Sequence, residues 1–136
     1  MGSSRPLTKK NVAERLARGL DLREADLRGI DLSGLSFDGA DLSHAKMAMC
    51  NLSKATFRNT NLFSASLWQS DLKDAVFDGA MMEEADLDLA DLDGATFHKA
   101  QVRKTIFPAG RVEWLEIERS IRTGQRVTMN RNRKGA

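Results

Sequence analysis

Large apolar residues recur at every fifth position over most of this 136-residue chain. Residues five apart in a helix are offset by about 140°, so such a series would scatter around the whole helix. In a continuous strand they would alternate between the two faces. The series therefore fits neither regular element. Its eighteen members are Leu22, Leu27, Leu32, Phe37, Leu42, Met47, Leu52, Phe57, Leu62, Leu67, Leu72, Phe77, Met82, Leu87, Leu92, Phe97, Val102 and Phe107.

We call these the central positions. The residue two before each is mostly small, with larger apolar residues only near the start (Leu20, Ile30 and Leu35). A short strand followed by a corner explains both series, because the central residue and the small residue then point inward together. The residue between them points outward, and the two residues after the central one form the corner. Stacked coils of such sides bury a continuous core.

A longer period sets the number of sides in each coil. Phe37, Phe57, Phe77 and Phe97 recur every twenty residues, and the words Phe37-Asp38-Gly39-Ala40 and Phe77-Asp78-Gly79-Ala80 are identical. Twenty residues correspond to four five-residue sides. The pattern therefore predicts an all-β solenoid of about 4.5 coils over residues 20–107, with the four phenylalanines stacked as a ladder along one side.

The repeated unit resembles the motif A(D/N)LXX of the pentapeptide-repeat family. Ala25-Asp26-Leu27, Ala40-Asp41-Leu42, Ala85-Asp86-Leu87 and Ala90-Asp91-Leu92 carry this resemblance, which covers roughly two thirds of the chain. It implies a right-handed quadrilateral β-helix. It specifies the fold more sharply than any activity.

The flanks of the repeat block predict a helix at each end. Residues 1–19 read as a flexible start and a capping helix over about Thr8–Arg18, with Asn11 or Thr8 as N-cap and Gly19 as its end. After Pro108, residues 108–124 read as a helix over Arg111–Arg122 that Gly124 ends. Residues 125–136 are polar and basic and read as a disordered tail.

Two roles stay open for the second helix. It can cover the last coil, or it can also form the seam of a homodimer. Trp114, Ile117 and Ile121 share one stripe, whereas Val112 and Leu115 lie off it, and a cap needs only one apolar face.

The sequence favours binding over catalysis. The repeat block has no inserted loop, and the Asp and Asn residues between the inward positions recur with the structural period, as expected for groups that bond their own backbone at turns. His44 and His98 fall on different sides of different coils, and no Cys/His spacing suits a metal. We expect no enzyme activity, no cofactor and no metal. Cys50 occupies a small inward position and reads as core.

Large apolar side chains at outward positions are the first candidate site. With twenty residues per coil, they converge on the middle coils, and such a cluster commonly marks a contact surface for a protein partner or a second copy. We therefore predict a scaffold module without catalytic activity. The candidate residues are Met49, Phe63, Trp68, Met81 and Leu89.

Charge suggests two alternatives. Residues 20–107 carry nine basic and fifteen acidic residues, whereas the two ends are basic. A row of carboxylates on a rigid rod can imitate DNA, which resembles the proposal for gyrase-protecting members of the family. Alternatively, the basic tail contacts nucleic acid. The acidic face comprises Asp71, Asp74, Asp78, Glu83, Glu84, Asp86, Asp88, Asp91 and Asp93.

Location is constrained only weakly. No apolar run is long enough to span a membrane, no signal peptide is evident near the start, and the single cysteine allows no internal disulfide. We expect a cytoplasmic protein, with a thylakoid or periplasmic location left open.

Overall fold

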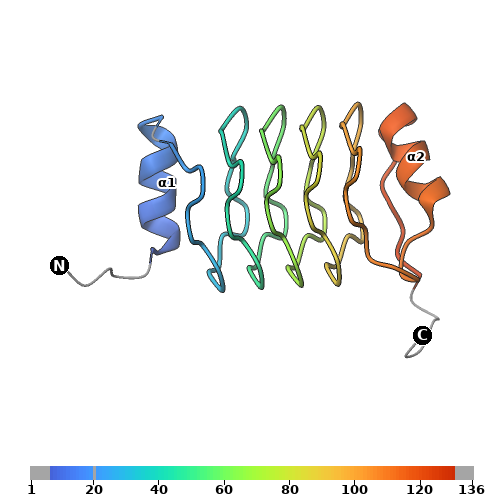
Figure 1. Cartoon of the computed structure of the whole chain (residues 1–136), viewed down its shortest axis with the longest axis horizontal. Helices are drawn as coiled ribbons and strands as arrows, with labels where there is room; N and C mark the ends of the chain where they lie inside the picture. The colour runs from blue at the N-terminus through green and yellow to red at the C-terminus, as the bar shows by residue number, and fades with distance from the viewer. Residues whose placement is uncertain (1–6, 20, 131–136) are drawn as a thin grey trace.

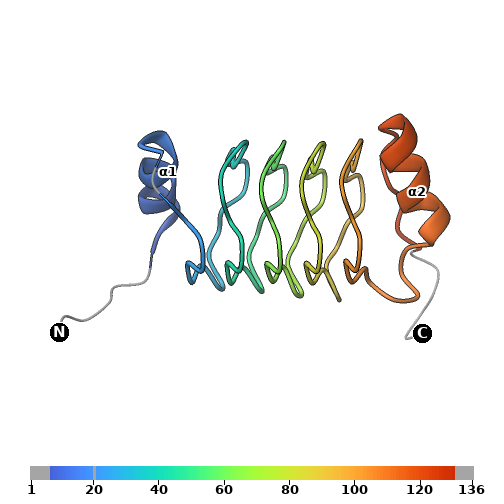
Figure 2. The same ribbon diagram turned by 45° about the horizontal axis from the view of Figure 1, so that its top comes forward.

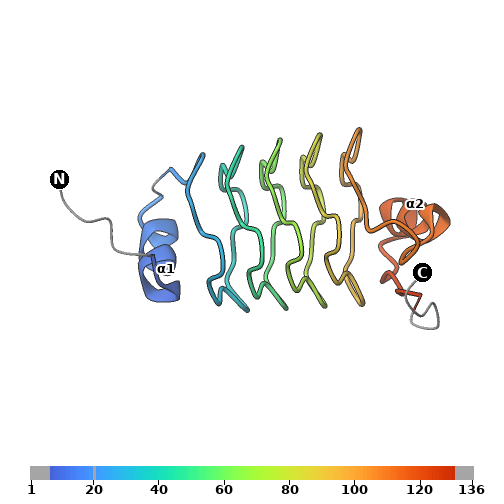
Figure 3. The same ribbon diagram turned by 60° about the horizontal axis from the view of Figure 1, so that its bottom comes forward.

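The chain forms a stack of coils between two helices. The computed structural model describes residues 7–19 and 21–130. Helix α1 (Lys9–Ala17) lies at one end of the stack and helix α2 (Trp114–Thr123) at the other (Figure 1). Views from two further directions show that the corners of successive coils stay aligned along the whole stack (Figures 2 and 3). No helix among the described residues is long and apolar enough to cross a membrane.

Parallel bridges between residues twenty apart define the register of the coils. Asp31, Asn51, Asp71 and Asp91 form one such column. The bridging residue is always the outward residue between the two inward positions, and the bridges of the described chain are isolated rather than joined into strands. The short strands that the sequence predicts are thus reduced to single bridges, because five residues must also include a corner.

Each corner is a tight turn with a left-handed residue. At one corner the Ala45 amide donates to the carbonyl oxygen of Leu42 at 3.0 Å, and His44 between them has φ 59°. A positive φ at this place is what a type II turn requires. Glycine serves at Gly29, Gly34 and Gly39, but most later corners use residues with side chains.

The core consists of the central positions. From Leu22 to Phe97 every one of them is buried. The rings of Phe37, Phe57, Phe77 and Phe97 stack with centroid separations of 5.0, 4.9 and 5.0 Å and nearly parallel planes. The predicted aromatic ladder is therefore present, and it fills one side of the interior with close contacts.

Polar residues at the small inward positions bond to the preceding coil. Thr60 Oγ1 donates to the carbonyl of Phe37 at 2.7 Å, and Ser70 Oγ donates to that of Met47 at the same distance. Cys50 Sγ donates to the carbonyl of Leu27 at 2.9 Å, and burial raises the pKa of its thiol. These contacts satisfy buried groups that would otherwise be costly, and they place Cys50 in the core.

Helix α1 lies against the first coil. Thr8 is its N-cap: the Thr8 hydroxyl accepts from the Asn11 amide, and the Asn11 side chain accepts from the Thr8 amide. This reciprocal pair resembles a capping box with Asn in the place of Glu. Val12 is fully buried and Leu16 packs partly against the core cluster. Gly19 follows with φ 66°.

Helix α2 begins three residues later than the sequence suggests. The chain first turns at Pro108–Arg111, where the Arg111 amide donates to the Pro108 carbonyl, so the helix starts at Trp114. Gly124 ends it with φ 81°. Ile117 is fully buried against the last coil, and the Ser120 hydroxyl accepts from the Phe97 amide at 2.9 Å.

The prediction of a disordered tail over 125–136 is wrong for residues 125–130. These residues run back along the last coil, where Val127 and Met129 are buried. The polar, basic composition of this stretch predicted disorder. Its two apolar side chains are nevertheless enough to pack against the core, because the edge of the last coil faces them. Residues 131–136 lie outside the described part of the chain.

Candidate protein-binding surface

Two exposed apolar side chains occupy corner positions with a left-handed backbone. Met49 is 53% exposed with φ 58°, and Leu89 is 57% exposed with φ 61°. Residues other than glycine, asparagine and aspartate pay roughly 1–2 kcal/mol for this conformation. Neither burial nor backbone preference therefore accounts for a methionine or a leucine at these two positions.

Trp68 lies at the same corner in the coil between them. The Met49 amide donates to the Trp68 carbonyl at 2.8 Å, and the Gln69 amide donates to the Asp88 carbonyl next to Leu89 at 2.9 Å. Trp68 is partly buried. We call Met49, Trp68 and Leu89 the outer corner. They lie at one corner of three successive coils, with Met49 and Leu89 at equivalent positions on either side of Gln69, and Trp68 directly before Gln69.

Phe63 and Met81 form a separate pair. Both are a little over one third exposed, and the Leu62 amide donates to the Met81 carbonyl at 2.8 Å, which sets them in adjacent coils. The Phe63 ring meets His44 edge-on, with centroids 5.4 Å apart. The bridged column Lys46, Ser66 and Asp86 lies between this pair and the outer corner. Four of the five predicted residues thus occupy two neighbouring corners with a polar row between them, and Met81 lies at a bridged outward position beside the corner of Phe63.

A third apolar area lies at the end of the stack. Ile106, Trp114 and Leu115 are each more than half exposed, and the Trp114 ring lies 6.4 Å from that of Phe107. Of the residues assigned to a cap or dimer seam, Ile117 is buried, Val112 and Ile121 pack partly against the core, and Trp114 and Leu115 remain outside. Our sequence interpretation missed Ile106, although an isoleucine at an outward position was a visible signal.

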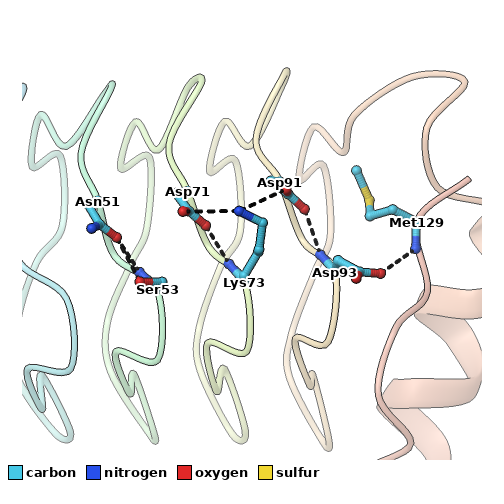
Figure 4. Close-up of polar contacts among 7 residues, drawn as sticks. All are labelled: Asn51, Ser53, Asp71, Lys73, Asp91, Asp93 and Met129. Atoms are coloured by element: carbon cyan, nitrogen blue, oxygen red, sulfur yellow. Dashed lines mark hydrogen bonds and ion pairs between the residues drawn. The ribbon is translucent and has the colours of Figure 1, made fainter. Parts of the chain in front are cut away.

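Several of the acidic residues bond to their neighbours. Lys73 Nζ lies 3.4 Å from Asp71 and 3.5 Å from Asp91, so it bridges two coils (Figure 4). The negative charge of Asp71 raises the pKa of Lys73. Asp78 Oδ1 accepts from the Thr96 hydroxyl and the His98 amide, and Asp74 lies 3.6 Å from Arg126. Imitation of DNA by this face stays a prediction, because these contacts do not test it.

Outward aspartates support their own corners, as the sequence suggested. Asp71 and Asp91 each accept a hydrogen bond at 3.0 Å from the amide two residues later. Asp26 does the same, and the Arg28 side chain donates to it; this side-chain bond is the main reason that its pKa falls to about 2. Among the described residues, no group of three His, Cys, Asp or Glu side chains could hold a metal ion.

The stacked coils and buried five-residue register define a solenoid of pentapeptide units. The family model for pentapeptide repeats matches eight copies, over residues 21–59, 50–77 and 70–107. The chain therefore belongs to the pentapeptide-repeat family, which confirms the resemblance drawn from its sequence.

Two solved structures illustrate the similarity. The chain is 33% identical to alr5209, a pentapeptide repeat protein from Nostoc Pcc 7120, over 84% of this chain and 96% of that one, with a TM-score of 0.68. It is 30% identical to AT2G44920, a pentapeptide repeat protein of the Arabidopsis thaliana thylakoid lumen, with a TM-score of 0.53; the match covers 60% of each chain. A comparison with curated proteins found no significant match.

Proposed function

We propose that the protein is a non-catalytic interaction module that binds a protein partner through the outer corner. One observation carries the proposal: Met49 and Leu89 are large, more than half exposed, and held at φ 58° and 61°. A side chain that brings neither core packing nor a favourable backbone is best explained by a contact outside the chain. The rigid stack would present the three side chains in a preformed arrangement, which lowers the entropy lost on binding.

The size and chemistry of the outer corner suit a contact between proteins. Tryptophan and methionine are enriched at protein interfaces, and a few such anchors commonly carry most of the binding energy. The neighbouring polar row of Lys46, Ser66 and Asp86 would form the hydrated rim of the contact. The partner is therefore expected to offer an apolar pocket or groove.

The test compares partner capture by wild-type protein with capture by three single variants, Met49→Asn, Trp68→Ala and Leu89→Asn. We expect each to lower retention of the same protein at least tenfold. Lys54→Asn is the matched control, because Lys54 is also exposed at a left-handed corner, with φ 62°. The proposal fails if no protein is captured by wild type and by Lys54→Asn but lost from the three outer-corner variants. It also fails if Lys54→Asn loses the same protein.

A second candidate is self-association through the end of the stack. The exposed Ile106, Trp114 and Leu115 favour it. Light scattering of wild-type protein and of Leu115→Gln over a range of concentrations tests it. We expect a dimer that the substitution dissociates, and a monomer in both samples at every concentration would reject this role.

A further inference from the structure

Residues 126–130 occupy the edge of the last coil where a further coil would continue. We call this segment the strap. The Gly94 amide donates to the Val127 carbonyl at 2.8 Å, and the Val127 amide donates to the Ala95 carbonyl at 2.8 Å. One coil earlier, the corresponding bonds join Asp74 to Asp93 and Thr96 to Ala75. Through Val127 alone, the strap therefore bonds backbone groups of the edge that a further coil would otherwise bond.

The side chains of the strap alternate as those of a bound strand do. Val127 is 1% exposed and Met129 is 4% exposed, whereas Arg126 and Thr128 point to solvent. Residues two apart share one face of an extended segment. The end of the solenoid thus offers two apolar subsites with the spacing of an extended peptide.

Charged side chains hold the backbone and the first residue of the strap. The Met129 amide donates to Asp93 Oδ1 at 3.1 Å (Figure 4), and the Thr128 amide donates to Glu116 Oε1 at 3.0 Å. Arg126 lies 3.6 Å from Asp74. A groove lined by Asp74, Asp93 and Gly94 runs beside the strap. Backbone pairing, apolar subsites and an acidic partner for a basic residue are the components of a peptide-binding site.

We propose that the end of the solenoid is a binding site for an extended peptide, which the chain's own strap occupies in cis. The ligand class is a segment with a basic residue followed by two apolar residues two apart, as in Arg126-Val127-Thr128-Met129. This site lies at the edge of the last coil and is separate from the outer corner.

The contacts indicate that the strap can be displaced. Its backbone bonds to the coil through Val127, at Gly94 and Ala95. The Thr128 and Met129 amides bond to side chains, and the Asn130 amide bonds to the Arg111 carbonyl. It follows Gly124, a left-handed residue directly after α2. Because the strap is tethered, it competes with a free peptide at a high effective concentration. The wild-type chain would therefore bind a free peptide weakly, and release of the strap would open the site.

The test uses the full chain and a labelled peptide of residues 125–130, Gln-Arg-Val-Thr-Met-Asn, with blocked ends. Val127→Asp in the chain introduces a charge into the buried subsite and is expected to release the strap. We expect saturable binding of the peptide to this variant, measured by fluorescence anisotropy. Binding to the wild-type chain is expected to be at least tenfold weaker, and so is binding of a peptide that itself carries Val127→Asp.

Gln125→Asp in the chain is the matched control, since Gln125 is exposed and its introduced charge lies outside the subsites. This chain should bind the peptide as weakly as the wild type does. Hydrogen exchange at the Gly94 amide provides a second readout: it should accelerate in the Val127→Asp chain and slow again when peptide is added. If that variant does not fold, Val127→Thr, which keeps the side-chain shape, replaces it in the same measurements.

Three results would overturn the proposal. The first is no saturable binding to a folded variant up to about 1 mM peptide. The second is equal binding to the wild-type and variant chains, which would place the peptide elsewhere. The third is a Gly94 amide that stays protected from exchange in the Val127 variant, or one that exchanges faster there and is not protected again by the peptide.

Discussion

The phenylalanine ladder and the outer corner use similar side chains for opposite purposes. Phe37, Phe57, Phe77 and Phe97 are fully buried and stacked about 5.0 Å apart, so their contacts lie within the chain. Met49 and Leu89 take the same corner position two coils apart, with Gln69 between them, yet more than half of each is exposed and each occupies a left-handed backbone. The difference teaches that repetition marks scaffold when the side chain points inward and suggests recognition when it points outward.

The largest expected effect is on stability, and it distinguishes a buried phenylalanine from an exposed one. Phe57→Ala would remove a ring that lies between two others, and we expect it to lower the free energy of unfolding by about 3–5 kcal/mol. Phe63→Ala, at an exposed corner, should change it by less than about 1 kcal/mol. Urea unfolding followed by circular dichroism measures both, and equal losses would contradict the distinction.

A buried hydroxyl should have the next largest effect. Ser70 Oγ donates to the Met47 carbonyl and accepts from the Cys50 amide at 3.1 Å. Ser70→Ala would leave both groups unpaired in the core, so we expect a loss of about 1–3 kcal/mol. Ser66→Ala, at an outward position, is the control and should be near neutral. The same unfolding measurement checks the pair, and a neutral Ser70→Ala would show that these bonds add little.

At the outer corner, a substitution that weakens partner binding should leave the stability of the fold almost unchanged. Leu89→Asn exchanges an exposed leucine for a residue that tolerates positive φ. We expect the free energy of unfolding to stay within about 1 kcal/mol of wild type or to rise, because relief of the backbone offsets the lost contacts. Thermal unfolding tests this. A large loss of stability would mean that Leu89 supports the fold, and its proposed role in binding would lose its basis.

The smallest effect concerns acid stability of the first coil. The folded pKa of Asp26 is lowered to about 2, below its ordinary value of 3.8, chiefly by the hydrogen bond from Arg28. A lowered folded pKa adds stability above about pH 4, and this contribution is lost as the pH falls toward 2. Arg28→Gln should therefore be slightly less stable than wild type at pH 6 and equal to it near pH 2. Melting curves across this range test the sign, and a difference that grows toward pH 2 would reverse it.

Much of the inner architecture could be predicted from the residues. The central series identified which side chains are buried, and the spacing of four phenylalanines predicted their stacking. The candidate sites were less predictable. Phe63 and Met81 lie next to the outer corner. The bridged column of Lys46, Ser66 and Asp86 separates this pair from the outer corner.

The ends of the stack escaped prediction for a different reason. Val127 and Met129 lie in a stretch that is polar and basic, and no local period marks them. Their burial depends on an unpaired coil edge at Gly94 and Ala95, which exists only after the preceding coils have formed. Trp114 belongs to the apolar stripe of its helix, yet it remains exposed because α2 turns Ile117 and Ser120 to the coil.

The sequence by itself determined the repeat, its register and the family, because each five-residue unit repeats the same order of inward, outward and corner residues. The tertiary structure alone decided how the corners group the exposed apolar residues and how the strap closes the last coil. The physical reason is the range of the interactions: the repeat reflects local geometry copied many times, whereas the surface and the ends depend on which coils and chain segments meet in space.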